Sequence, residues 1–180
     1  MTDAALIERA RDGDADARAA LAEEFAPKIT RYLTAMLGEP AEDLAQQAFA
    51  AAFDRLGDLR DAEKFGSWLY SIAINQARSE LKRRAAEPTR ESEPDAIAGR
   101  TSVLSSIVRR ESAEALALAI ERLPIALREA FVLRVLEELP YATIVDATET
   151  PERTLHVRVH RAKALLRSQL GKVVDTYWSG

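Results

Sequence analysis

The sequence predicts an all-α protein made of two small helical domains joined by a flexible linker, the C-terminal domain containing a helix-turn-helix. Ala, Leu, Glu and Arg dominate the 180 residues, and β-branched runs with period-two alternation are missing. After Arg84 the composition shifts to Pro, Gly, Ser and Thr, which is typical of a linker. Near the C-terminus, a short and a long helical segment are separated by residues 148–150. We therefore expect domains over residues 1–84 and 111–172, a linker over 85–110 and a tail over 173–180.

Apolar residues three and four positions apart indicate the helices of both domains. In the N-terminal domain, Asp14 is placed to cap the second helix. Pro27 predicts a kink or a restart inside that helix, because proline has no amide hydrogen for the helical hydrogen bond. The expected helices cover residues 6–11, 15–37, 41–56 and 65–84 in the first domain, and 111–122, 125–137, 140–147 and 151–170 in the second.

The composition excludes several classes of protein. No cysteine occurs, which excludes disulfides, thiolate metal sites and cysteine nucleophiles. The N-terminus lacks the basic start and apolar run of a signal peptide, and no run of about 18 apolar residues occurs. We therefore expect a cytoplasmic protein without membrane insertion. The net charge of −4 argues against nucleic-acid binding through overall charge but leaves room for a local basic face.

The last predicted helix concentrates positive charge, since Glu152 is the only acidic residue from position 151 through 172. Thr150 is placed to cap this helix, and Pro151 fits its first turn. An inward face is expected from Leu155, Val159, Ala162 and Leu166. The residues placed to meet base edges in a major groove are Arg153, His156, Val157 and Arg161. From the helix alone, a solvated basic face on an ordinary helical hairpin fits equally well.

Three segments around this helix resemble sigma factors. Residues 154–162 (TLHVRVHRA) are similar to the family's Thr-Val-Lys-Ser-Arg-Leu-His-Arg-Ala. Residues 128–134 (REAFVLR), which follow a Leu-Pro pair, are similar to its Arg-Glu-Val-Leu-Leu-Leu-Arg, and residues 136–141 (LEELPY) to its Leu-Ser-Tyr segment. Such a helix-turn-helix is shared with two-component response regulators. The resemblance implies contacts with the −35 promoter element from Arg153, Thr154, His156, Val157, Arg158, His160 and Arg161.

Residues 41–49 (AEDLAQQAF) are similar to the Ala-Glu-Asp-Leu-Val-Gln-Glu-Thr-Phe core of the extracytoplasmic-function (ECF) sigma factors. In that family this helix binds the coiled coil of the RNA polymerase β′ subunit. The resemblance implies polymerase contacts from Glu42, Asp43, Gln46, Gln47 and Phe49. Judged from the residues alone, a solvated polar face is the more common role of such a helix.

Residues 65–75 (FGSWLYSIAIN) match the ECF pattern Phe-x-x-Trp-Leu-Tyr-Arg-Ile-Ala-x-Asn. In that family, this helix and the preceding loop hold a base that is flipped out of the −10 element while the promoter melts. We expect a base pocket formed by the loop 59–64 with Ile72 and Asn75, and Trp68 in the core. The resemblance implies −10 contacts from Leu59, Arg60, Asp61, Lys64, Ile72, Asn75, Lys82, Arg83 and Arg84.

Several positions depart from the family pattern. Pro40 and Gln47 replace common acidic residues, which predicts altered polymerase binding. Glu149 stands where glycine is usual and is strained if φ at this position is positive. Val157 cannot hydrogen-bond a base edge, which predicts either an unusual −35 preference or a duplex contact that depends more on shape and phosphate. The apolar residues 124–127 suit the polymerase β flap or an anti-sigma factor.

The leading hypothesis is a sigma factor with no catalytic activity and no cofactor. Its expected partners are core RNA polymerase (through the β′ coiled coil and the β flap), promoter DNA and an anti-sigma factor. Two alternatives stay open: an autonomous regulator that uses only the helix-turn-helix, and a sigma-like module that sequesters an anti-sigma factor. His156 and His160 lie one helical turn apart, but we expect no metal site because no carboxylate lies close in sequence and arginines flank them.

Overall fold

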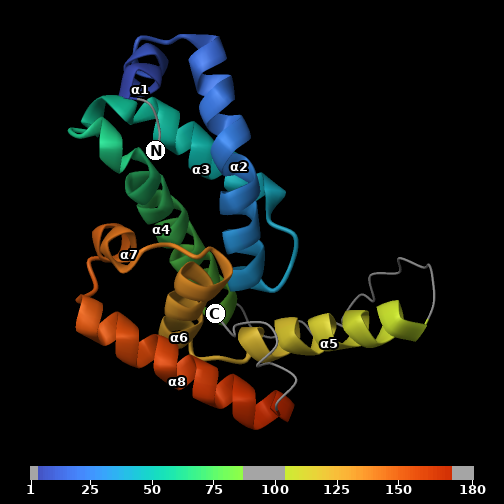
Figure 1. Cartoon of the computed structure of the whole chain (residues 1–180). Coiled ribbons are helices and arrows are strands. Elements are labelled where there is room, and N and C mark those ends of the chain that lie inside the picture. The colour runs from blue at the N-terminus through green and yellow to red at the C-terminus, as the bar shows by residue number, and fades with distance from the viewer. Residues whose placement is uncertain (1–3, 87–103, 172–180) are drawn as a thin grey trace.

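The computed structural model describes residues 4–86 and 104–171 (Figure 1). Every element in these two ranges is helical, which confirms the all-α prediction. The N-terminal domain comprises α1 (Ala4–Arg11), α2 (Ala15–Leu37), α3 (Glu42–Asp54), the 3₁₀ turns η1 (Leu56–Asp58) and η2 (Ala62–Lys64), and α4 (Phe65–Ala86). The C-terminal domain comprises α5 (Leu104–Glu121), α6 (Ile125–Phe131), the π-helical turn η3 (Val132–Leu136), α7 (Tyr141–Thr148) and α8 (Glu152–Leu170). None of these helices combines the length and apolar composition that crossing a bilayer requires.

The long helix α2 begins and ends where its sequence predicts. The Asp14 side chain accepts hydrogen bonds from the backbone N–H groups of Asp16 and Ala17 at 2.9 and 3.1 Å, which confirms it as the N-cap. The helix ends at Gly38, whose φ of +77° is readily accessible to glycine. No restart occurs at Pro27, and α2 continues through it. The buried face on both sides of the proline holds the helix together despite the missing hydrogen bond.

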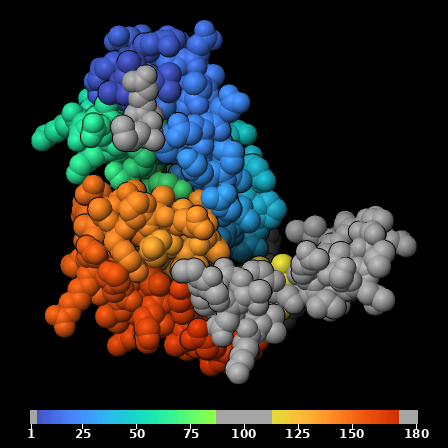
Figure 2. Space-filling view, viewed as in Figure 1, coloured from blue at the N-terminus to red at the C-terminus, as the bar shows by residue number. Residues whose placement is uncertain are grey.

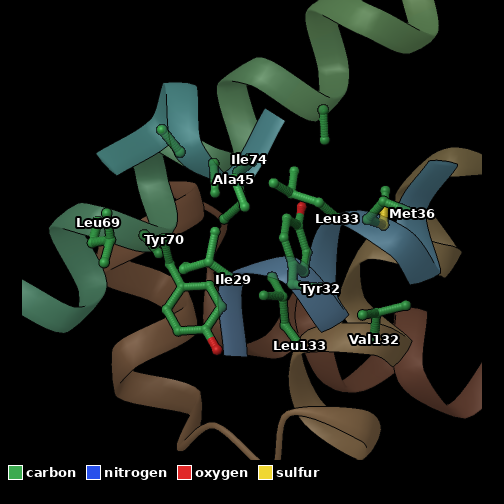
Figure 3. Close-up of a cluster of buried hydrophobic side chains, with 14 of the residues drawn as sticks. Ile29, Tyr32, Leu33, Met36, Ala45, Leu69, Tyr70, Ile74, Val132 and Leu133 are labelled. Atoms are coloured by element: carbon green, nitrogen blue, oxygen red, sulfur yellow. The ribbon is translucent and has the colours of Figure 1, made fainter. Parts of the chain in front are cut away.

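One hydrophobic core extends from the N-terminal domain into the C-terminal domain (Figure 3). Tyr32 of α2 and Tyr70 of α4 meet edge to face with ring centroids 5.9 Å apart. Val132 and Leu133 of η3 belong to the same cluster and are fully buried. The C-terminal domain is therefore packed onto the N-terminal domain.

The last helix presents the inward face that its sequence predicts, since Leu155, Val159, Ala162 and Leu166 are all buried. The predicted cap is wrong, however. Pro151 occupies the N-cap position of α8, and Thr150 makes no cap because its hydroxyl donates to the Thr148 carbonyl at 3.4 Å. The turn before α8 is thus closed by hydrogen bonds among its own residues.

The helices on either side of the linker reach further into it than the composition predicts. α4 continues to Ala86, and α5 begins at Leu104, within the segment 85–110 that we expected to be a linker. Leu104, Ile107 and Val108 lie at positions i, i+3 and i+4, so the helical spacing of α5 already starts there. The rest of the predicted linker and the predicted tail 173–180 lie outside the described residues.

The short helix α7 lies against α4 of the N-terminal domain (Figure 1). The space-filling view shows the C-terminal domain in direct contact with the N-terminal domain (Figure 2). This contact places the end of α7 beside the turn η2 and the first half of α4, where the −10 contacts are predicted.

Candidate nucleic-acid interface

A cavity of about 440 Å³ opens between the loop 59–64, helix α4 and helix α7. It brings together most of the residues predicted to hold a flipped base. Asn75 is exposed at its edge, and Trp68, expected in the core, is only half-buried and lines its wall. The lining consists of Leu59, Arg60, Asp61, Lys64, Ser67, Trp68, Ser71, Asn75 and Arg78 from the N-terminal domain and Asp146, Ala147, Thr148 and Glu149 from the C-terminal domain.

Hydrogen bonds from α1 fix the loop that borders this cavity. The Arg11 guanidinium donates to the carbonyl oxygens of Leu59 and Leu56 at 2.6 and 3.4 Å. The Asp61 side chain accepts from the Glu63 backbone N–H at 3.0 Å and so caps η2. Arg11 was not among the predicted site residues, and its only signal in the sequence is its place as a cation in the last turn of a helix. The loop is thus a fixed wall of the cavity.

Ile72 does not belong to the cavity in which it was expected. It lines a second cavity, also of about 440 Å³, together with Leu44 and Gln47 of α3. Asn75 lies on the ridge between the two and borders both. The single predicted pocket is therefore two hollows on either side of one exposed asparagine, because Ile72 projects toward α3 rather than toward the loop.

The cations at the end of α4 are largely engaged within the chain. Arg83 and Arg84 both donate to the Glu80 carboxylate, at 2.6 and 2.8 Å, and these hydrogen bonds lower the pKa of Glu80 to about 2. Arg84 also pairs with Glu39. Lys82 is exposed. A phosphate approaching this helix end would have to compete with Glu80 for the two arginines.

The predicted polymerase face on α3 is exposed at four of its five positions, namely Glu42, Asp43, Gln46 and Gln47. Phe49 is the exception. Its ring is buried and packs beside Phe53 with centroids 6.0 Å apart. The helical spacing puts Phe49 on the apolar side of α3, which leaves little of its ring for contact with a docked partner.

The basic helix α8 presents most of its predicted −35 residues to solvent. Arg153, His156, Val157, His160 and Arg161 are exposed, and Thr154 and Arg158 are half-buried. The expectation that no carboxylate lies near the histidines was wrong, because Glu152 Oε1 lies 3.4 Å from His156 Nε2. The His156 ring also stacks on Tyr141 of α7, with centroids 3.9 Å apart. His156 is therefore held against the first helix of the helix-turn-helix.

Glu149 ends α7 in the left-handed conformation, with φ +54° and ψ 22°. This meets the condition for backbone strain that the sequence raised. Its backbone N–H donates to the Val145 carbonyl at 2.8 Å, as a helix cap requires. The turn between the two helices thus has a left-handed helix cap, but the residue at this position is a glutamate, which adopts that conformation less readily than glycine.

A buried carboxylate of the C-terminal domain, that of Glu137, joins the two domains. It accepts from Arg31 Nε and Nη2 of α2 at 2.6 and 2.7 Å and from the Tyr70 hydroxyl of α4 at 3.1 Å. Its hydrogen bond with Arg31 raises the pKa of that guanidinium, and burial is the main cause of the raised pKa of Tyr70. No sequence motif had indicated this contact.

A second set of contacts joins the domains along α4 and the end of α2. The Glu129 carboxylate accepts two hydrogen bonds from Arg78 at 2.7 and 2.8 Å. Arg128 is buried and donates to the Met36 carbonyl, in the last turn of α2, at 2.6 Å. Two neighbouring residues of α6 thus bind the N-terminal domain: Glu129 pairs with the Arg78 guanidinium, and Arg128 donates to the Met36 carbonyl.

Comparison with known proteins agrees with this architecture. The family model described as "Sigma-70 region 2" matches residues 21–87, and that described as "Sigma-70, region 4" matches residues 113–166. The ECF RNA polymerase sigma factor SigW of Bacillus subtilis is 30% identical over 176 residues, covering 91% of this chain and 94% of that protein. The RNA polymerase sigma-H factor of Pseudomonas aeruginosa is 32% identical over 180 residues, covering 93% of each.

Two solved structures share the fold. CnrH, in complex with the cytosolic domain of CnrY, has a TM-score of 0.70 at 19% identity and covers 97% of both chains. The sigma factor RpoE of Bartonella quintana, in complex with the anti-sigma factor NepR, has a TM-score of 0.65 at 18% identity and covers 84% of this chain and 94% of that one. With both sigma-70 regions matched in order and curated ECF relatives covered over nearly their full length, the chain belongs to the ECF subfamily of sigma-70-type sigma factors and is an alternative sigma factor that directs transcription initiation.

Proposed function

We propose that the N-terminal domain binds core RNA polymerase and the −10 element, and that α8 of the C-terminal domain reads the −35 element, with no catalysis by the chain itself. The chain acts where the polymerase is, in the cytoplasm. One observation supports this proposal most strongly: the loop 59–64 with Asn75 and the exposed basic face of α8 lie on different domains of one chain. Each site then contacts a separate stretch of promoter.

The −10 function rests on the N-terminal wall of the cavity, which the loop 59–64 and α4 form. Its rim carries the Asn75 amide, which both donates and accepts hydrogen bonds and so can read a base edge. Arg60 and Lys64 line the same cavity and supply cations for the neighbouring phosphates. Extruding a base costs a few kcal/mol, which such contacts offset.

The −35 function rests on the outward face of α8. A major groove admits a helix, and the N-terminal residues of a recognition helix meet the base edges. Arg153 and Arg161 are exposed there and suit guanine edges or phosphates, and Val157 between them is 44% exposed and suits a thymine methyl group. This face favours a mixture of apolar and backbone contacts over a purely hydrogen-bonded readout.

Polymerase docking rests on the exposed polar side of α3, where Glu42, Asp43 and Gln46 suit a basic partner such as the β′ coiled coil. Ile125, at the start of α6, is 47% exposed and suits an apolar partner such as the β flap. Because RpoE of Bartonella quintana was solved with an anti-sigma factor, we include such a factor among the partners of this chain.

Reconstitution with core RNA polymerase tests the proposal. The purified chain is mixed with core enzyme and a library of random promoters, and the transcripts are sequenced. We expect polymerase binding and enrichment of two sequence blocks. Absence of polymerase binding would refute the proposal, and binding without promoter selection would favour the module that sequesters an anti-sigma factor.

A matched pair of charge reversals locates the polymerase contact. Asp43→Lys is expected to abolish binding to core enzyme, because it removes the net negative charge that Glu42 and Asp43 give the proposed docking face. Glu23→Lys changes the net charge equally at an exposed position of α2 and is expected to leave binding unchanged. Equal loss of binding in both variants would contradict docking through α3.

A further inference from the structure

Side chains from three elements of the C-terminal domain stack around His156 on the exposed face of α8. The His156 ring lies on the ring of Tyr141, the first residue of α7, with centroids 3.9 Å and planes 30° apart. The Arg134 guanidinium of η3 also lies over the Tyr141 ring, 5.2 Å from its centroid. This stack fixes the position of a histidine whose side chain stays 55% exposed.

Glu152 sets the orientation of the same ring. Its Oε1 atom lies 3.4 Å from His156 Nε2, one helical turn further along α8. An ionised carboxylate only accepts hydrogen bonds, so Nε2 carries the proton in this contact. The other ring nitrogen, Nδ1, is then an acceptor when the ring is neutral and a donor when it is an imidazolium. Neither the stack nor the contact with Glu152 uses Nδ1.

Nδ1 is therefore the atom through which this ring can read a base. His156 lies beside Arg153 and Val157 on the exposed face of α8 that is proposed to meet the −35 element. In a major groove, cytosine and adenine present amino groups as donors, whereas guanine presents two acceptors, N7 and O6. A neutral ring thus suits cytosine or adenine, and an imidazolium suits guanine.

Charged groups of both signs surround the His156 ring. Its titratable and charged neighbours one turn away on α8 are Glu152, Arg153 and His160, and those from the elements packed against it are Tyr141 of α7 and Arg134 of η3. The two acidic residues of α7, Asp146 and Glu149, lie at the other end of that helix. Because Nε2 carries a proton in both charge states, the contact with Glu152 holds the ring in the same orientation in either state.

We infer that His156 is a proton-dependent specificity-determining residue of the −35 contact, and that Glu152 and Tyr141 are the positioning residues that hold its Nδ1 toward the base. This inference rests on the proposed −35 function of α8. At higher pH, Nδ1 accepts a hydrogen bond from cytosine or adenine at one −35 position. At lower pH, it donates to guanine at that position. The relative occupancy of promoters that differ at this base therefore changes with pH.

Promoter selection at two pH values tests the inference on the chain assembled with core polymerase. A library keeps the −10 element of one selected promoter and randomises the −35 element, and the bound promoters are sequenced. Binding is measured at about pH 6 and about pH 8, on either side of the range in which histidine side chains usually titrate. We expect one −35 position at which the ratio of guanine to cytosine and adenine is about three- to tenfold higher at the lower pH, as one hydrogen bond predicts. A base preference that is the same at both pH values at every −35 position would overturn the inference.

His156→Gln and Glu152→Gln assign the pH effect to this pair. Glutamine at position 156 hydrogen-bonds but does not titrate, so the pH-dependent change at this base should disappear. Glutamine at position 152 both donates and accepts, so it no longer selects the proton on Nε2, and the change should fall below about twofold. Glu138→Gln removes the same charge from an exposed position of the same domain and should behave as the parent chain does. A change of parental size in either of the first two variants would contradict the inference.

Tyr141→Phe and Tyr141→Leu test the stack. Phenylalanine keeps the ring under His156 and should preserve the pH-dependent base preference, whereas leucine removes the ring and should relax it. Equal preferences in these two variants would refute a positioning role for the ring.

The same selection distinguishes failure of this inference from failure of the proposed function. The comparison of two pH values on the parent chain requires no substitution, and Glu152 is exposed, so the test does not depend on the folding of the leucine variant. Enrichment of a −35 sequence whose base preferences ignore pH refutes only the role of His156. Absence of any −35 enrichment at both pH values refutes the proposed −35 function of α8.

Discussion

Replacing Glu149 by glycine is expected to stabilise the protein by roughly 0.5–1 kcal/mol. Glu149 has φ +54° and ψ 22° at the end of α7. A residue with a Cβ atom loses about 1–2 kcal/mol in this conformation, and the greater freedom of glycine in the unfolded chain takes back about 0.5–1 kcal/mol. The cap itself stays, because it uses the Glu149 backbone N–H, which donates to the Val145 carbonyl.

Thermal unfolding followed by circular dichroism measures this effect, with Glu149→Ala as the matched control. The alanine variant loses the same exposed carboxylate but keeps the Cβ atom and therefore the strain. For a chain of this size, the difference should place the melting temperature of the glycine variant about 1–4 °C above that of the alanine variant. Equal melting temperatures for the two variants would show that this turn is not strained.

Three further substitutions test the packing, the charges and the domain contact. Leu155→Ala should lower the free energy of unfolding by about 2–5 kcal/mol, measured by denaturant titration, whereas the exposed Leu165→Ala should cost under about 1 kcal/mol. Glu80, whose pKa falls from 4.5 to about 2 on folding, contributes stability above pH 4.5 that is lost as the pH drops toward 2. The stability difference between the parent chain and Glu80→Gln should follow this decline, and a difference independent of pH would contradict the pairing. Tyr70→Phe removes one hydrogen bond to the buried Glu137 carboxylate and should lower the free energy of unfolding, measured by denaturant titration, by about 1.5–3 kcal/mol.

Local patterns predicted the elements of the fold well. The Asp14 cap, the stop of α2 at Gly38 and the inward face of α8 each depend on residues within one or two turns of each other. Helix caps and the buried face of a helix follow from the types and spacing of neighbouring residues, so they can be predicted from the sequence. The strain at Glu149 was also foreseeable, because a turn of known geometry was matched to a residue that disfavours it.

Features that depend on contacts distant in sequence were not foreseen. Glu137 lies 106 positions from Arg31, and a glutamate beside a second glutamate reads as part of a solvated loop. The π-helical turn that precedes Glu137 has no distinctive sequence, because the packing of Val132 and Leu133 in the shared core stabilises it. The polymerase contact that the resemblance implies for Phe49 stays a prediction, because the ring of this residue is buried on the inward face of α3.

The candidate −10 site was predictable as a set of residues but not as a shape. The loop 59–64 and Asn75 do border one cavity, yet Ile72 lines another, and the C-terminal domain supplies the remaining wall. The position of α7 follows from ion pairs and apolar packing between the domains. Neither the ion pairs nor the apolar packing can be predicted from the sequence of the loop 59–64.

Promoter binding and promoter melting, measured separately on one selected promoter with core polymerase, test the division of labour between the two domains most directly. Arg161→Ala should weaken duplex binding about 10- to 100-fold through the −35 element. Asn75→Ala should leave duplex binding nearly unchanged and reduce melting, seen as lower permanganate reactivity of unpaired thymines. Equal loss of binding and melting in both variants would contradict separate readout of the two elements by the two domains.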